Sequence, residues 1–297
     1  MAVQATNYDG TREYEVAEVK DVYRPNLLIN GDFQCNQRGE PVYDFGQTLS
    51  YGYTLDMWYS AKVKVTKFNA PSEWIQLDNK DNTSHVFKQR INLKNSTKYT
   101  FTTWVAQPTG TVKISLERQG ETGIDLMTLK KGRNEVTFTS PANSESTQLA
   151  ICFVMGVNSS IGVLYANLFE GDIAYPRVKE DYNVALARCQ QYLKCYRDPA
   201  LFIASVDSGS QYVCETVVDS LMTKYRPTLI QHGRLHGYGT AGGVDIVGTS
   251  LGYISLSSGR LLIKFEADKH KSFGTGRSNV VVLGNPGDYI EITCEPL

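Results

Sequence analysis

The sequence lacks the features by which several common classes of protein are recognised. Its six cysteines are scattered, with no C-x-x-C pair and no histidines at zinc-finger spacing. They are Cys35, Cys152, Cys189, Cys195, Cys214 and Cys294. This spacing excludes a local metal or redox motif. In a chain long enough to fold without cross-links, we expect reduced, mostly buried thiols.

Long apolar runs and an excess of charge are missing too. No segment approaches the roughly 18 apolar residues that span a bilayer, and the first residues, MAVQATNYDG, lack a basic-then-apolar signal segment. With 30 basic and 31 acidic residues the formal net charge is −1. We therefore expect no membrane insertion, no nucleic-acid partner, and synthesis in a cytoplasm without a signal peptide.

Motifs of the common enzyme classes are also missing. There is no H-E-x-x-H and no phosphate-binding G-x-x-x-x-G-K-[ST], and the glycines of residues 237–242 lack the strand and helix of a dinucleotide site. His232 and His236 are four residues apart, but the glycines beside them favour a loop over a metal-binding helix. We predict no catalytic residue, no metal centre and no cofactor.

Aromatic residues, by contrast, are plentiful, with 18 Tyr, 11 Phe and 3 Trp in 297 residues, a length that suits two domains. Residues 26–174 contain short alternating or apolar runs separated by Gly, Pro, Asn, Asp and Ser, which is typical of an antiparallel sandwich. Residues 98–105, KYTFTTWV, are the clearest strand, with aromatics on both faces. The chain is therefore predicted to be mainly β, with a second β region after residue 198.

One segment between the two β regions has a helical period. In residues 176–196, PRVKEDYNVALARCQQYLKCY, apolar or aromatic side chains recur at intervals of four, three, four and three. They are Tyr182, Leu186, Cys189, Leu193 and Tyr196. The spacing predicts one helix of about five turns. Two heptads fit both a helix packed on its own subunit and a short seam between subunits.

Several motifs in the sequence resemble those of known protein families. Residues 26–33, NLLINGDF, and residues 99–105 are similar to the opening N-L-x-x-N-G-x-F and the central Y-x-F-x-x-W-V strand of jelly-roll carbohydrate-binding modules. Residues 37–39, QRG, and 55–59, LDMWY, resemble Q-R-G and A-D-x-W of phage tail-fibre and baseplate proteins, with Leu55 in place of the usual Ala. Residues 185–192, ALARCQQY, resemble the segment that joins sandwich to head in those proteins.

The resemblance implies a virion protein in four parts. These are an attachment arm for other virion proteins (residues 1–25), a jelly-roll β-sandwich (26–175), a linking α-helix (176–197) and a C-terminal β-sandwich head (198–297). It also implies a homotrimer, in a tail fibre, baseplate or capsid fibre, that adsorbs to host cell-surface polysaccharide. Related modules often hold a structural calcium near the N-G-x-F segment, where Asp32 is the candidate ligand.

Sugar binding by a jelly roll needs exposed aromatic rings that stack under a pyranose. The predicted rings lie in residues 39–53, and second candidates lie in the glycine-rich residues 233–248, which we expect to be a surface loop. They are Tyr43, Phe45, Tyr51 and Tyr53, and then His236 and Tyr238. Trp74 is also available, whereas Trp58 and Trp104 lie in strand patterns and are predicted to be core.

Two other functions fit the same sequence. One is a purely structural virion component, in which the early tyrosines pack between copies and read no sugar. The other is a glycan-active enzyme with an accessory binding module, because the separation of two catalytic carboxylates is spatial and is not visible in a sequence. Exposed coplanar rings favour glycan binding, and shortening of a polysaccharide would identify the enzyme.

Overall fold

The computed structural model shows a chain of two units. The first comprises Met1–Gln34, Pro41–Thr54 and Trp58–Asp181, and the second Cys35–Glu40, Leu55–Met57 and Tyr182–Leu297. The description covers residues 3–6, 13–16, 25–44, 51–68, 73–118, 123–146, 148–177, 179–197, 201–208, 211–217, 228–232, 235–239, 242–255, 260–267, 279–283 and 289–293. Within these residues no helix has the length and apolar character needed to cross a membrane.

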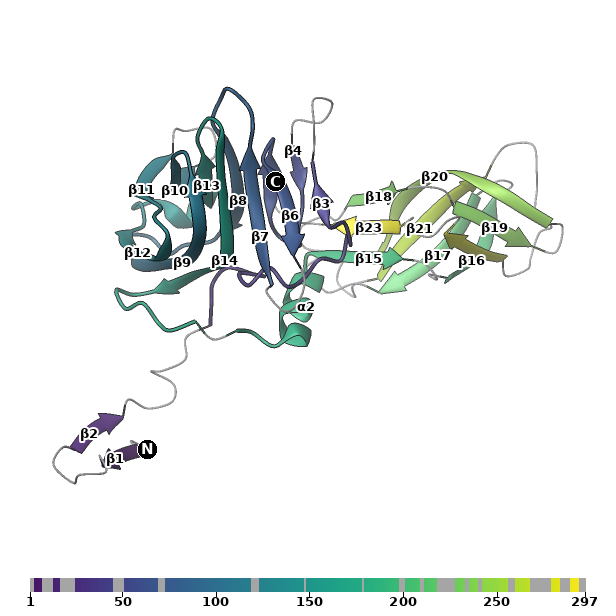
Figure 1. The fold of residues 1–297 in the computed structure, drawn as a ribbon. Helices are drawn as coiled ribbons and strands as arrows, with labels where there is room; N and C mark the ends of the chain where they lie inside the picture. The colour runs from purple at the N-terminus through teal and green to yellow at the C-terminus, as the bar shows by residue number, and fades with distance from the viewer. Residues whose placement is uncertain are drawn as a thin grey trace. The chain divides into compact units, whose positions relative to one another are not determined.

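Two six-stranded antiparallel sheets form the sandwich of the first unit (Figure 1). One has the order β12-β9-β14-β7-β6-β3: Gly132–Thr139, Lys98–Thr109, Ser159–Glu170, Trp74–Asn79, Lys64–Phe68 and Val42–Tyr43. The other has the order β11-β10-β13-β8-β5-β4: Ile124–Thr128, Val112–Arg118, Leu149–Met155, His85–Ile91, Tyr59–Ala61 and Tyr51–Tyr53. A short 3-10 turn, Ser144–Ser146, precedes β13. The predicted jelly-roll sandwich is confirmed.

Aromatic side chains form much of the core between the sheets. Trp58 is fully buried and stacks on Phe87 of β8, with ring centroids 4.8 Å apart and planes 9° apart. Its indole Nε1–H donates to the carbonyl of Asn30 at 3.1 Å, which satisfies the polar atom that burial would otherwise leave unpaired. The prediction that Trp58 is core is confirmed.

Trp104 of β9 was predicted to be core as well, and this is wrong. Successive side chains of a strand point to opposite faces, so Tyr99, Phe101 and Val105 point into the sandwich while Trp104 points out. The first three are at most 1% exposed, whereas Trp104 is 38% exposed. The outer face of this sheet is therefore partly aromatic.

The N-L-x-x-N-G-x-F segment, residues 26–33, forms turns that are hydrogen-bonded to β14. The Asn26 amide donates to the carbonyl of Ala166 at 2.9 Å, and its Oδ1 accepts from the backbone N–H groups of Leu28 and Leu168. A side chain at Gly31 would come within 2.2 Å of the Ala166 carbonyl oxygen, so only glycine fits this close approach. The motif is thus explained by packing.

The described parts of the arm, β1 (Val3–Thr6) and β2 (Glu13–Val16), pair antiparallel. The pairing runs from Val3↔Val16 to Thr6↔Glu13. Pairing satisfies the backbone N–H and C=O groups that an extended arm exposes.

Strands of the second unit form a three-stranded sheet and a closed barrel. The sheet has the order β15-β23-β18: Leu193–Arg197, Tyr289–Thr293 and Thr228–His232. The barrel has the order β16-β17-β21-β20-β19-β22: Leu201–Ser208, Gln211–Val217, Arg260–Ala267, Gly242–Ser255, Leu235–Gly239 and Asn279–Leu283. The β class of the predicted head is confirmed, but its strands close into a barrel instead of a sandwich because β22 pairs with both β16 and β19.

Two local predictions in this unit are wrong. The helix α2 spans only Tyr182–Gln190 (Figure 1), because residues 193–197 pair with β23 as strand β15. The glycine-rich residues 233–248 were expected to be a surface loop, yet β19 and the start of β20 pair there, from Leu235↔Ile246 to Gly239↔Gly242. In both places backbone pairing with a distant or neighbouring strand overrides the local composition.

Candidate functional site

Aromatic side chains gather on the outer face of the sheet β12-β9-β14-β7-β6-β3. Phe68 of β6 and Trp74 of β7 are direct cross-strand partners, so they share a face. A Cβ atom added to Gly162 of β14 would lie 2.7 Å from the Trp74 ring and 3.3 Å from the Ala106 Cβ atom. Trp74 and Ala106 therefore lie on the same face of the sheet. Trp104 is two residues from Ala106 on β9 and therefore points the same way.

We call Phe68, Trp74 and Trp104 the aromatic face. Phe68 and Trp74 stack with ring centroids 4.4 Å apart and planes 9° apart. Phe68 is 39% and Trp104 38% exposed, and Trp74 is half-buried. Large rings that stay partly in water on a rigid sheet are available for stacking, because the sheet fixes their positions before a ligand arrives.

Hydrogen-bonding groups lie beside these rings on the same face. Gln76 and Asp78 follow Trp74 at alternate positions of β7 and are half-buried. The Gln76 amide and the Ser160 hydroxyl both lie within hydrogen-bond distance of the Asp78 carboxylate, and the amide also donates to Ser160. This network holds an amide, a hydroxyl and a carboxylate in fixed orientations next to an apolar surface.

Another part of the outer face, next to Trp104, lies under the segment that follows β14. The Arg177 guanidinium lies over the Tyr165 ring, 5.1 Å from its centroid, and Tyr175 packs edge-on against Phe169. Burial raises the pKa of the Tyr165 phenol, while the charges of Arg133 and Arg177 oppose that shift. With Arg177 over its ring, Tyr165 is only 7% exposed. The open part of the face is therefore the part that carries Phe68, Trp74 and Trp104.

Asp32, the candidate calcium ligand, has both carboxylate oxygens engaged by protein groups. Oδ1 accepts from the Arg177 guanidinium at 2.8 Å, and Oδ2 accepts from the backbone N–H of Glu180 at 3.1 Å. The side chain is 7% exposed. These contacts anchor the segment over Tyr165, and the calcium prediction continues to rest on the resemblance alone.

The predicted glycan-binding residues are not brought together by the described part of the structure. Tyr43 is 7% exposed because its strand turns it toward the core, so its assignment to a binding surface is wrong. Tyr53 is half-buried on the opposite sheet, edge-on to Tyr59 at 5.5 Å. Tyr51 begins β4, His236 and Tyr238 lie on β19, and Phe45 lies outside the described residues. Glycan binding by Tyr51, His236, Tyr238 and Phe45 stays a prediction.

The predicted seam does not form one helical stripe. Tyr182 and Val184 of α2 are 50% and 52% exposed, whereas Cys189 and Leu193 are fully buried within their own unit. Leu186 is half-buried, and Leu193 and Tyr196 lie on β15. A continuous heptad seam from Tyr182 to Tyr196 is therefore wrong, because the helix ends at Gln190.

The Q-R-G motif, residues 37–39, is bonded to the three-stranded sheet β15-β23-β18 of the second unit. The Arg38 guanidinium makes a two-pronged ion pair with Glu291 of β23, at 3.2 Å from Nε to Oε2 and 2.7 Å from Nη2 to Oε1, with both side chains at most 5% exposed. The Gln37 amide donates to Asp56 at 2.9 Å and to the carbonyl of Leu193 at 3.0 Å. Both halves of the motif pair, Q-R-G and L-D-M-W, thus have a structural role.

Residues 248–252, GTSLG, have the letters of a nucleophile elbow, but they lie inside β20, where Thr249, Ser250 and Leu251 pair with β21. An elbow requires a sharp strand-to-helix turn, which a paired strand interior does not provide. This serine is therefore not arranged as a nucleophile of that type.

No family model and no curated protein matches the sequence. Among solved structures, the enzymatically active domain of tailspike protein 4 of bacteriophage CBA120 is similar at 17% identity and a TM-score of 0.32, covering 49% of this chain and 21% of that one. TmCBM61 in complex with β-1,4-galactotriose is similar at 15% identity and a TM-score of 0.31, over 50% and 100% of the two chains. A family 29 carbohydrate-binding module is similar at 13% identity and a TM-score of 0.30, over 46% and 100%.

Proposed function

We propose that the chain is a non-enzymatic virion protein whose sandwich binds a glycan of the host surface on the aromatic face. The observation that carries the proposal is a set of rings on one face of a single sheet, of which Phe68 and Trp104 are exposed and Trp74 is half-buried. Pyranose rings present patches of C–H groups that pack on flat aromatic surfaces, and such surfaces on a soluble protein mark a binding site.

Neighbouring polar groups give this surface the chemistry to select a sugar. The network of Gln76, Asp78 and Ser160 offers donors and acceptors whose orientations are already set, which suits the hydroxyls at the edge of a pyranose. The chain as a whole carries no charge excess that would favour a polyanion. A neutral polysaccharide is therefore the class of ligand that we propose.

Alanine variants of the aromatic face test this proposal. We expect Phe68→Ala, Trp74→Ala and Trp104→Ala each to weaken binding about tenfold or more, because truncating an aromatic hot spot typically costs about 2 kcal/mol or more. Binding is measured as retardation in native gels containing a soluble galactan, xylan, mannan or β-glucan.

Ile124→Ala is the matched control, since Ile124 is 59% exposed on β11 of the opposite sheet. It should bind like the wild type, and the near-ultraviolet circular dichroism of all variants should remain that of a folded chain. Unchanged retardation of all three aromatic variants would place the site elsewhere. A loss with Tyr53→Ala alone would move it to the opposite sheet.

The virion setting of the proposal is supported by the motifs shared with tail-fibre and baseplate proteins. We place the chain in a tail fibre, baseplate or capsid fibre, as a homotrimer whose residues 1–25 attach it to other virion proteins. A purely structural virion component, in which the exposed rings pack between copies and bind no sugar, is the second candidate function.

A further inference from the structure

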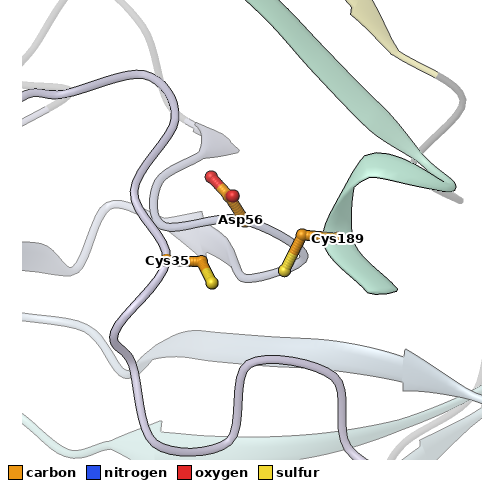
Figure 2. A group of neighbouring side chains, drawn as sticks. All are labelled: Cys35, Asp56 and Cys189. Carbon is orange, nitrogen blue, oxygen red and sulfur yellow. The ribbon is translucent and has the colours of Figure 1, made fainter. Parts of the chain in front are cut away.

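Two cysteines and an aspartate that are far apart in the sequence meet in the interior of the second unit. The Sγ atoms of Cys35 and Cys189 and a carboxylate oxygen of Asp56 all lie within 4.8 Å of one another. All three residues are fully buried. Figure 2 shows that they come from three separate segments, two loops and the helix α2.

We propose that Cys35, Asp56 and Cys189 bind a zinc-class divalent ion, with the fourth position left to water or a nearby protein oxygen. Two thiolates and one carboxylate are a ligand set that favours zinc over magnesium or calcium, since soft sulfur ligands select the softer ion. Coordination releases the two thiol protons to solvent, and the ion accepts a lone pair from each sulfur and from the carboxylate oxygen.

The spacing of the atoms suits such an ion with little movement. Two sulfurs bound to one tetrahedral zinc at about 2.3 Å lie roughly 3.8 Å apart. A separation of at most 4.8 Å therefore needs only a small change in side-chain torsion to reach that value. Cys189 lies in the last turn of α2, whose position is fixed by burial of Ala185 and Cys189.

The carboxylate is also held as metal-binding carboxylates usually are. Asp56 Oδ1 accepts from the backbone N–H of Gln37 at 2.8 Å, and Oδ2 accepts from its side-chain amide at 2.9 Å. Hydrogen bonds of this kind orient a carboxylate that acts as a metal ligand. A bound ion would join the Q-R-G segment, the L-D-M segment and α2 where they meet, and neutralise the charges that burial makes costly.

Cobalt provides a direct readout, because a thiolate-bound Co²⁺ ion gives a sulfur-to-metal charge-transfer band in the near ultraviolet. We expect the full chain, purified with reductant and without chelator, to take up one Co²⁺ with this band, and zinc to displace it. Zinc should also slow the alkylation of Cys35 and Cys189 in moderate urea, where transient opening of the chain makes buried thiols accessible, as mapped by mass spectrometry. Neither readout depends on glycan binding, so failure here leaves the proposed function untouched.

Variants assign the ligands. Cys35→Ser and Cys189→Ser should lower the affinity for Co²⁺ by about tenfold or more and abolish or weaken the band. Cys152→Ser, which alters another fully buried cysteine outside the cluster, should leave both unchanged. If the two ligand variants fail to fold, the band and the alkylation pattern of the wild type decide.

Three results would overturn the site. They are a wild-type chain without the charge-transfer band, a band that survives both ligand variants, and a Cys35–Cys189 disulfide that forms equally with and without zinc.

Discussion

At the scale of single residues, the direction in which a strand points a side chain decides its role. Trp58 and Trp104 both lie in apolar, aromatic sequence, yet one is fully buried and the other 38% exposed. The alternation of β9 contains this information, because Trp104 is out of phase with Tyr99, Phe101 and Val105. Sequence reasoning could have placed Trp104 on the outer face by following that phase.

Cys152 shows how burial sets the chemistry of one side chain. Burial raises the pKa of its thiol well above the usual range, and the nearby Glu117 carboxylate, whose Oε2 lies 3.2 Å from Sγ, raises it further. The folded chain therefore keeps the proton at a pH where the unfolded chain loses it. The resulting stabilisation is fully present below the unfolded pKa of about 8.5 and is lost as the pH rises above it.

We predict that replacing this thiol flattens the alkaline decline in stability. The free energy of unfolding of the wild type should fall above pH ~8.5 more steeply than that of Cys152→Ala, by up to about 1.4 kcal/mol per pH unit. Urea denaturation at a series of pH values measures both slopes. The comparison concerns slopes only, so the cavity left by the substitution does not affect it, and equal slopes would contradict the assignment.

At the scale of elements, tertiary pairing overrides local periodicity. The intervals of four and three that predicted a helix through Tyr196 also place Leu193 at a buried strand position, and residues 193–197 pair with β23 from Leu193↔Thr293 to Arg197↔Tyr289. On the N-terminal side, Glu180 donates its backbone N–H to Asp32, which is outside the helix. Neither partner is visible in the local sequence, so the helix was predicted in the right place but too long.

The Arg38–Glu291 pair gives a prediction at this scale. Arg38→Ala should lower the free energy of unfolding by roughly 3–5 kcal/mol, because it leaves the Glu291 carboxylate buried without its cation. Replacing both partners, by Arg38→Met with Glu291→Leu, should recover much of that loss. Urea denaturation followed by circular dichroism measures both variants against the wild type.

Lys113→Ala is the matched control, since Lys113 and Asp125 form an exposed pair at 2.6 Å, with side chains 39% and 56% exposed. Its loss should cost at most about 1 kcal/mol. Equal effects of Arg38→Ala and Lys113→Ala would show that the buried pair does not hold the sheet.

At the scale of the whole molecule, the sequence predicts the class of fold better than the site. The β-sandwich follows from alternation and turn residues, which are local properties. The aromatic face depends on the strand order β9-β14-β7-β6, which puts Trp104 in the same sheet as residues 68 and 74 from far along the chain. The cluster of Cys35, Asp56 and Cys189 depends on topology in the same way, and the absence of a local cysteine motif concealed it.

The oligomeric state is a property of the whole molecule, and we predict a trimer. We expect the full chain to have three times its 33.1 kDa mass by light scattering after size-exclusion chromatography. Val184, 52% exposed on α2, is better placed than the buried Leu193 to meet a neighbouring copy. If α2 is the contact, Val184→Asp should yield folded monomers, whereas a monomeric wild type would contradict the trimer.

The most direct test of glycan binding on the aromatic face uses the three tryptophans as reporters. In a ¹⁵N-labelled chain titrated with oligosaccharides of the polysaccharide that retards it, the indole N–H signals of Trp74 and Trp104 should shift and saturate together. Trp58 is the internal control, because its indole is fully buried and bonded to Asn30. Saturable binding that leaves the Trp74 and Trp104 signals unmoved would contradict the account.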